Sequence, residues 1–340
     1  MLSPDRRAPP VLARVVRDEV VEAVHRGHLV ITDASGAVVT GLGDPECLVY
    51  ARSAIKPFQA LGSLDLLDSA GVTLDSDGVA IACASHTGST LHQVEVAQIL
   101  ARADLDEEAL RCPAVLPRDL ATLLDQRAPT VLSHNCSGKH AGFLLATKAA
   151  GADLAEYLHP DAPVQRAARA RLAEATSTKL RGPGVDGCGA PAWILPLGSL
   201  ATAFARLVRG DEPYRRVRDA MLARPHLVGG PGRTDTTLML GDHRVVAKVG
   251  AEAVLAVGFY HEWHGPLGLA VKIEDGRHRA TGPVVGATLK ALGGQVRRSL
   301  LRPAVLGGGV PHGAVEPEPS VVAMVRAVFD DDPADSKLAT

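Results

Sequence analysis

Hydrophobic and polar positions follow a strand-like pattern near both ends of the chain and a helical period between them. Apolar runs bounded by Gly- and Asp-containing turns predict strands at 11–17, 28–36, 37–43, 244–252, 253–261 and 267–276. Apolar residues spaced three and four apart predict helices at 53–68, 90–103, 118–126, 137–150, 163–175, 198–209, 213–223 and 282–292. The chain closes on a polar stretch, 330–340, which we expect to be a frayed tail.

Strands at both ends with helices between them do not form a regular β–α alternation. We therefore expect an α/β (α+β) fold in which an antiparallel sheet is built from both termini and a mainly helical lobe is inserted. No internal repeat or low-complexity linker divides the chain, so residues 1–340 are expected to form a single catalytic unit. Its first lobe would span about 10–55 plus 235–315, and its second about 56–234.

Composition and charge narrow the function classes. The 340 residues are 46% hydrophobic, and the net charge of -2 gives no electrostatic reason to expect nucleic acid or an anionic membrane as a partner. The N-terminal twenty residues lack the apolar core of a signal peptide, and no apolar run reaches the length of a membrane span. We therefore expect a cytoplasmic protein without a nucleic-acid or membrane partner.

The five cysteines are an odd number in a chain too long to need disulfide stapling, so free thiols in a reducing compartment are expected. They are Cys47, Cys83, Cys112, Cys136 and Cys188. The first three have the surroundings of core cysteines, with Cys83 on a predicted apolar strand. The last two lie on Gly-containing stretches and leave a metal site open.

Lysine is scarce: 28 of the 36 basic residues are arginine and eight are lysine. Arginine cannot lose its proton in practice, so it serves neither as a base nor as a metal ligand, whereas a desolvated lysine amine can do both. Positions that keep lysine are therefore enriched for such roles, although about half of the eight are expected to be ordinary surface residues.

Three short elements with scarce residues occur in a characteristic order. Ser53 and Lys56 form S-x-x-K at a predicted helix start, where one helix face brings the amine to the hydroxyl. The second, S-x-N, ends in Asn135, the sole asparagine of the chain, and the third, K-x-G, begins with Lys248 on a predicted strand. Together they form the signature of serine β-lactamases and penicillin-binding proteins. Taken alone, S-x-x-K is a weak motif, and a helix cap explains Ser53 better than a nucleophile does.

Two further stretches carry candidate chemistry. An apolar strand predicted at 79–83 ends in hydroxyl-bearing residues that include Ser85, although a turn followed by a helix cap is the likelier pattern-level interpretation. Cys136, Lys139 and Cys188 supply two thiols and a nitrogen donor, which suits zinc. Buried, inert cysteines are the alternative.

Five segments, ARSAIKP, CASHTGS, NCSGKHAG, VDGCGAP and AKVGAE, in this order, resemble the asparaginase II family, the thermolabile rhizobial type of L-asparaginase. The resemblance runs from about residue 12 to about residue 310. It implies a serine β-lactamase-like fold, a homodimer, and hydrolysis of L-asparagine to L-aspartate and ammonia. The flanks Val185, Gly189 and 229–239 differ more, so the exact amide hydrolysed stays open.

The same resemblance implies roles for individual residues. Ser53, the nucleophile, pairs with Lys56, and Ser85 pairs with Lys248 in proton transfer to the leaving group. Zinc would be held by three residues, which are Cys136, Lys139 and Cys188.

Four more residues fall inside the matching motifs. Asp186 matches a position beside the metal, and Arg52, Asn135 and His140 have no assigned role. The roles of His86 and His134 are equally open. Two rival functions remain: another serine amidase, such as a glutaminase or a β-lactam-recognising protein, and a non-catalytic zinc-binding module.

Overall fold

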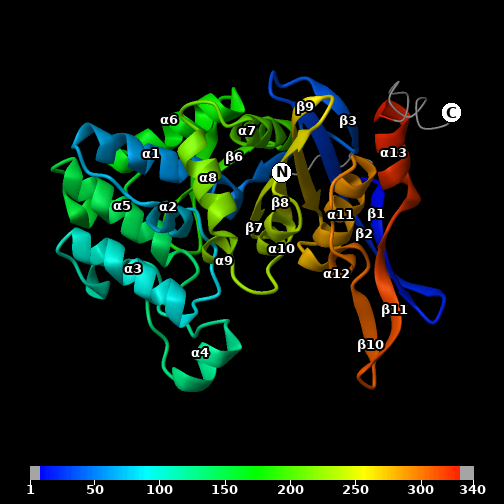
Figure 1. Ribbon diagram of the computed structural model, residues 1–340, viewed down its shortest axis with the longest axis horizontal. Helices are drawn as coiled ribbons and strands as arrows, with labels where there is room; N and C mark the ends of the chain where they lie inside the picture. The colour runs from blue at the N-terminus through cyan, green and yellow to red at the C-terminus, as the bar shows by residue number, and fades with distance from the viewer. Residues whose placement is uncertain (1–7, 330–340) are drawn as a thin grey trace.

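A computed structural model describes residues 8–329; the polar tail expected at 330–340 lies outside this range. The protein is a mixed α/β structure with a curled antiparallel sheet on one side and a body of helices on the other (Figure 1). No helix within the described range is long and apolar enough to cross a membrane.

The main sheet draws strands from both ends of the chain, as the sequence predicts, in the order β10-β11-β1-β2-β9-β8-β7, with β3 paired to β2. Its strands are β1 (Val11–Arg17), β2 (Val20–Asp33), β3 (Val38–Leu42), β7 (Val245–Gly250), β8 (Val254–His261), β9 (Gly265–Ile273), β10 (Ala304–Gly307) and β11 (Val310–Pro317). The 14-residue β2 is long enough to pair with β1 through its first half and with β9 and β3 through its second. The strand pair β10–β11 was not expected from the sequence.

Helix α7 (Leu197–Arg209) packs against β2, β8 and β9, although its sequence falls inside the stretch expected to form the helical lobe. Two glycines that face each other across the β8–β9 ladder, Gly258 and Gly268, make this approach close. A Cβ atom on Gly268 would lie 1.8 Å from the backbone oxygen of Ala201, and one on Gly258 would lie 2.4 Å from that of Phe204. The helix backbone therefore rests directly on the sheet.

Replacing Gly268 by alanine should lower the free energy of unfolding by about 3 kcal/mol or more, because a backbone contact cannot yield as a flexible side chain can. Urea denaturation followed by circular dichroism measures the change. Gly187→Ala is the matched control, since a Cβ there meets nothing within 4 Å. Equal midpoints for both variants would show that α7 does not need the glycine contact.

The helical body consists of α1 (Lys56–Ser69), α2 (Ser76–Ala82), α3 (Thr90–Arg102), α4 (Leu120–Asp125), α5 (Ser137–Ala149), α6 (Pro163–Thr176), α8 (Arg215–Ala223), α9 (Pro225–Val228) and α10 (Thr234–Gly241). The 3₁₀ turn η1 (Arg52–Ile55) leads into α1, which packs against α5 and α6. On the sheet side lie α11 (Thr281–Ala291), α12 (Arg298–Leu301) and α13 (Pro319–Phe329).

One secondary-structure prediction was wrong. The apolar run at 79–83, expected to be a strand, belongs to helix α2, and Cys83 is its C-cap. Asp75 begins this helix by accepting a hydrogen bond from the Gly78 backbone N–H with its side chain, 2.8 Å away. A short apolar run does not distinguish a buried strand from a buried helix, and the N-cap signal just before it decides.

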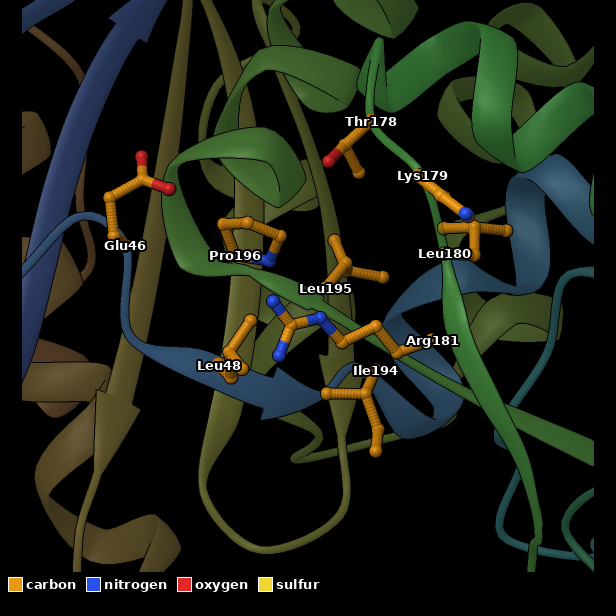
Figure 2. Close-up of a pocket in the computed structure, with 9 residues that line it drawn as sticks. All are labelled: Glu46, Leu48, Thr178, Lys179, Leu180, Arg181, Ile194, Leu195 and Pro196. Atoms are coloured by element: carbon orange, nitrogen blue, oxygen red, sulfur yellow. The ribbon is translucent and has the colours of Figure 1, made fainter. Parts of the chain in front are cut away.

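A small second sheet, in the order β4-β6-β5, joins the two parts of the molecule. It contains β4 (Leu48–Tyr50), β5 (Arg181–Val185) and β6 (Pro191–Pro196). A surface cavity of about 710 Å³ opens beside it, and Figure 2 shows Glu46, Leu48 and Arg181 among its lining side chains. None of the predicted site residues lines this cavity.

Candidate active site

A second, smaller cavity lies where η1, the loop after α2, the start of α5 and the β7–β8 turn meet. Its volume is about 260 Å³. Three of the predicted polar residues line it, namely Ser53, Ser85 and Asn135. Backbone from the end of β7 and four charged or titratable side chains complete the lining, and these are Arg118, Arg233, Glu252 and His278. The fold therefore brings the two predicted serines to one small polar site.

Ser53 is presented by a sharp local turn. Arg52, just before it, has φ 50°, in the left-handed region that costs free energy for any residue other than glycine. Gly250, at the end of β7, permits the close approach of η1, because a Cβ there would lie 2.7 Å from the backbone oxygen of Ala51. Within the described chain the Ser53 hydroxyl forms no hydrogen bond, and the side chain is half-buried.

Lys56 points to the other serine. Its buried amine lies 3.1 Å from Ser85 Oγ and donates to the backbone oxygens of Ala84 and of Asn135, the latter at 3.3 Å. The Ser53–Lys56 contact expected from their spacing is not among the hydrogen bonds of residues 8–329. Of the three oxygens around this amine, only the Ser85 hydroxyl can also donate a proton, so it is the one that can relay a proton to and from Lys56.

Buried histidines hold the loop that carries Ser85. His86 Nδ1 accepts from the Gly88 backbone N–H at 3.1 Å, so Nε2 bears the proton and donates to Ser137 Oγ at 3.0 Å. The ring stacks on that of His92, with centroids 4.8 Å apart. Burial, followed by the neighbouring His92, holds the pKa of His86 well below its usual value. His86 is therefore a neutral side chain that holds the loop by hydrogen bonds, and it does not supply a proton to the cavity.

In the segment before α5, Ser133 and His134 form hydrogen bonds within the protein, and Asn135 lines the cavity. Ser133, the first member of S-x-N, bonds to Gln126 Nε2 and Thr130 Oγ1, each at 2.9 Å. His134 Nδ1 accepts from the Cys136 backbone N–H at 3.0 Å, and burial lowers its pKa to about 4. Only Asn135 of the three lines the cavity, where its side-chain amide is available to a substrate.

Lys248 forms a fully buried ion pair with Asp235. Its amine lies 3.2 Å from Asp235 Oδ2 and 3.0 Å from the Val249 backbone oxygen, and both side chains are 0% exposed. Burial lowers the pKa of Lys248 to about 8, against the opposing effect of the Asp235 carboxylate. Contact with Ser85, expected from the motif, is not among the bonds of this amine in the described residues.

Cys83 is buried near the two lysines but is chemically inert. Burial raises the pKa of its thiol to about 12, although Lys248 and Lys56 both oppose this rise. A thiol with such a pKa provides almost no thiolate at neutral pH. Cys83 is therefore a buried core cysteine, as expected, although it caps a helix instead of lying on a strand.

Two thiols and an amine gather beside the cavity, at the start of α5 and on the 186–189 turn. Lys139 Nζ lies 3.2 Å from Cys188 Sγ, and Cys136 is hydrogen-bonded to the same sulfur. The Cys136 thiol, followed by the Lys139 charge, holds the pKa of Cys188 far below its usual value despite burial. Burial lowers the pKa of Lys139, but the neighbouring sulfurs outweigh this and leave it raised.

His140 completes the surroundings of the sulfurs. Its Nδ1 is 2.7 Å from the Tyr157 hydroxyl, whereas its buried Nε2 has no hydrogen-bond partner of normal geometry. Burial lowers the pKa of His140, and the nearby Cys188 sulfur offsets this only in part. Within residues 8–329 no three His, Cys, Asp or Glu side chains cluster as a metal-binding group, so a metal here needs the lysine amine. Two sulfurs and nitrogen donors suit zinc.

Comparison with protein families assigns the chain. A family model described as L-asparaginase II matches residues 13–317 of the 340. The chain belongs to the L-asparaginase II family. No curated protein shows significant sequence similarity to it. Membership indicates an amidohydrolase with a small-molecule substrate.

In this L-asparaginase II family member an ion pair links the thiol cluster to the serine turn. Arg52 Nε and its terminal nitrogen lie 2.9 Å and 2.8 Å from Asp186 Oδ1. The Asp186 backbone oxygen in turn accepts from the Gly189 N–H at 2.8 Å, which closes the turn that holds Cys188. The turn that carries Cys188 is therefore tied through Asp186 to Arg52, the residue next to Ser53.

Sequence reasoning missed Asp235 and the charged residues of the cavity. Arg233 and Asp235 fall in 229–239, which differs from the family pattern; Glu252 ends the AKVGAE segment without an assigned role, and His278 lies on a turn without a periodic signal. Their convergence depends on how β7, α10 and the turn after β9 meet. The one available signal was an acidic residue close in sequence to the K-x-G lysine.

Proposed function

We propose that the protein hydrolyses L-asparagine to L-aspartate and ammonia through an acyl-enzyme on Ser53, on a serine β-lactamase-like fold. The observation that carries the proposal is the cavity that Ser53, Ser85 and Asn135 share in a chain of the L-asparaginase II family. Its volume of about 260 Å³ lies below the roughly 300–1,000 Å³ of sites for drug-sized ligands, which suits an amino acid.

Ser53 is the better nucleophile of the two serines. Its hydroxyl is half-exposed at the cavity and, within the described chain, is not engaged by any protein group. Ser85 is 3% exposed and is held by Lys56. A nucleophile needs access to the substrate carbonyl, whereas a relay needs a fixed bond to the base.

In the proposed reaction Ser53 Oγ attacks the side-chain amide carbon of asparagine. Its proton passes to the Ser85–Lys56 pair, and backbone N–H groups beside Ser53 and Gly250 bind the oxyanion. The C–N bond then breaks as Ser85 and Lys56 return the proton to the departing nitrogen, which leaves as ammonia. Water hydrolyses the aspartyl ester on Ser53 with the same groups acting as base and then acid.

In our proposal Lys248 has a positioning role and takes no part in proton transfer. Its ion pair fixes Asp235 Oδ2, which also accepts from the Val249 backbone N–H at 3.2 Å. The end of β7 is thereby held against η1. The direct Ser85–Lys248 proton transfer implied by the motif is replaced in our scheme by the Ser85–Lys56 contact.

Zinc is proposed as the metal of the thiol cluster, with Cys136, Lys139 and Cys188 as its ligands. When bound, it would supply a positive charge that balances the thiolates and would cross-link the start of α5 to the turn that carries Cys188. Arg52 and Asp186 keep that cluster and Ser53 in a fixed relation.

Cys188→Ala should remove zinc from the purified protein, because a three-ligand site that loses a thiolate loses most of its affinity. Elemental analysis of metal-to-protein ratio measures this directly, with zinc-dependent thermal stabilisation as a second readout. Cys47→Ala, which removes a core thiol remote from the cluster, is the control. Retention of one zinc per chain in Cys188→Ala would refute the site.

A coupled ammonia assay with L-asparagine, L-glutamine and a β-lactam tests the proposed reaction. We expect ammonia from L-asparagine at a kcat/KM at least about tenfold above that for glutamine, since an added methylene is typically worth that factor. Preferred glutamine turnover or acylation by the β-lactam would favour another serine amidase. Stoichiometric zinc without ammonia release would favour a non-catalytic zinc-binding module.

A further inference from the structure

Four charged or titratable side chains line the cavity but take no part in the proton path just described. Arg118 lies on the loop before α4, Arg233 is the N-cap residue of α10, Glu252 lies on the β7–β8 turn, and His278 begins the 3₁₀ turn before α11. They come from four separate parts of the sequence. A cavity that gathers opposite charges in this way is built to recognise a charged ligand.

The two arginines and Glu252 are available to such a ligand. Within residues 8–329 none of these three side chains forms an ion pair or a hydrogen bond, in contrast to Arg52 and Lys248 nearby. Arg233 Nε is buried and has no partner. Leaving a buried donor unpaired costs about 1–3 kcal/mol, and a ligand that accepts a hydrogen bond from this nitrogen would recover that free energy.

The turn that carries Glu252 is strained. Glu252 and Ala253 have φ 57° and 55°, a conformation that non-glycine residues rarely adopt. The Lys272 amine donates to the Glu252 backbone oxygen and holds the turn in place. The carboxylate lies over Gly276, where a Cβ would come within 2.7 Å of Glu252 Oε2. Backbone strain and a close glycine contact thus fix this carboxylate at the cavity.

His278 lines the same cavity as the two unpaired charges. Burial lowers its pKa, the Arg233 charge lowers it further, and the Glu252 charge raises it. Both charges are therefore close enough to act on one imidazole, yet they do not pair with each other in the described structure. An α-amino acid presents a carboxylate and an ammonium group on the same carbon, which matches two opposite charges held near each other but apart.

We infer that Arg233 binds the α-carboxylate and Glu252 the α-ammonium group of the substrate. This inference rests on the proposed function and deepens it. The side-chain amide then points to Ser53, Ser85 and Asn135, while Arg118, exposed at the rim, attracts the anionic end.

The test combines variants with substrates that lack one α-group. Succinamate has no α-amine, and 3-aminopropanamide has no α-carboxylate. Glu252→Gln should lower kcat/KM for L-asparagine on the order of 10- to 100-fold, the value of one charge-assisted hydrogen bond, mainly through KM. The same variant should change kcat/KM for succinamate far less. Arg233→Met should show the reciprocal pattern, with a large loss for L-asparagine and a small one for 3-aminopropanamide.

Matched controls come from the other cavity. Glu46→Gln and Arg181→Met remove the same charges from the site in Figure 2, remote from the serines, and should leave every kcat/KM within about twofold of wild type. If Glu252→Gln lowers activity equally on L-asparagine and succinamate, the ammonium contact does not exist. Equal loss on L-asparagine and 3-aminopropanamide in Arg233→Met overturns the carboxylate contact in the same way.

A binding measurement separates this inference from the proposed reaction. Calorimetry on the Ser53→Ala variant should show binding of L-aspartate that is weakened by adding Glu252→Gln or Arg233→Met. Ammonia release without any such weakening would overturn the recognition contacts and leave the reaction standing. If the two variants weaken L-aspartate binding but the protein with Ser53 intact releases no ammonia, the contacts are supported and the reaction is rejected.

Discussion

Replacing Ser53 by alanine should lower kcat for L-asparagine hydrolysis by at least about 1,000-fold, with the fold intact. Without the hydroxyl no ester can form, and the remaining groups of the cavity supply only binding and oxyanion stabilisation. Steady-state ammonia release measures the loss, and thermal unfolding verifies that the variant is folded. Ser133→Ala is the control, because its hydroxyl is bound to Gln126 and Thr130 rather than directed to the substrate.

Ser85→Ala distinguishes the two serines. It should also reduce kcat, because Lys56 loses the hydroxyl that lies 3.1 Å from its amine, but a water molecule can replace a relay more readily than a nucleophile. A Ser53→Ala variant that keeps near-wild-type turnover while Ser85→Ala is inactive would assign the nucleophile to Ser85.

Replacing Lys248 by methionine should lower the free energy of unfolding by about 3–5 kcal/mol. The change leaves the Asp235 carboxylate buried at 0% exposure without its cation, and an unpaired buried charge is far costlier than the loss of a surface pair. Urea denaturation at neutral pH measures the effect. Adding Asp235→Asn removes the charge, so the double variant should recover a large part of the lost stability.

Lys148→Met is the control for this pair, because Lys148 bonds an Asp104 side chain that is 90% exposed and should matter by less than about 1 kcal/mol. A loss in Lys248→Met no larger than in Lys148→Met would contradict the buried ion pair. A double variant less stable than Lys248→Met would show that Asp235 is stabilised by something other than the lysine.

The periodic part of the fold could be predicted from the sequence. The pattern at 11–17 and 244–276 correctly placed strands from both termini in one antiparallel sheet, because alternation and short apolar runs report burial directly. The β10–β11 pair could not be predicted in this way, because it is short, rich in Gly and Pro, and exposed or half-buried at all but two of its residues. Its pairing with β1 depends on contacts across almost the whole length of the chain.

For the candidate site, the sequence indicates which residues take part but not which of them pair. Scarcity of lysine and asparagine pointed to Lys56 and Asn135, and the fold places both at the cavity or directly behind it. Which groups pair could not be read from spacing, because the S-x-x-K lysine turns to Ser85 and the K-x-G lysine to Asp235. Both contacts join different elements, 29 and 13 residues apart in sequence, and burial rather than helix geometry selects them.

Labelling with an asparagine analogue in which a diazoketone replaces the side-chain amide tests the central claim most directly. The nucleophile that attacks the amide carbon is alkylated by such a reagent, and peptide mapping by mass spectrometry locates the adduct. Our account predicts loss of activity with one adduct per chain, on Ser53, and protection by L-aspartate. An adduct on Ser85, or full activity after exposure to the reagent, would contradict it.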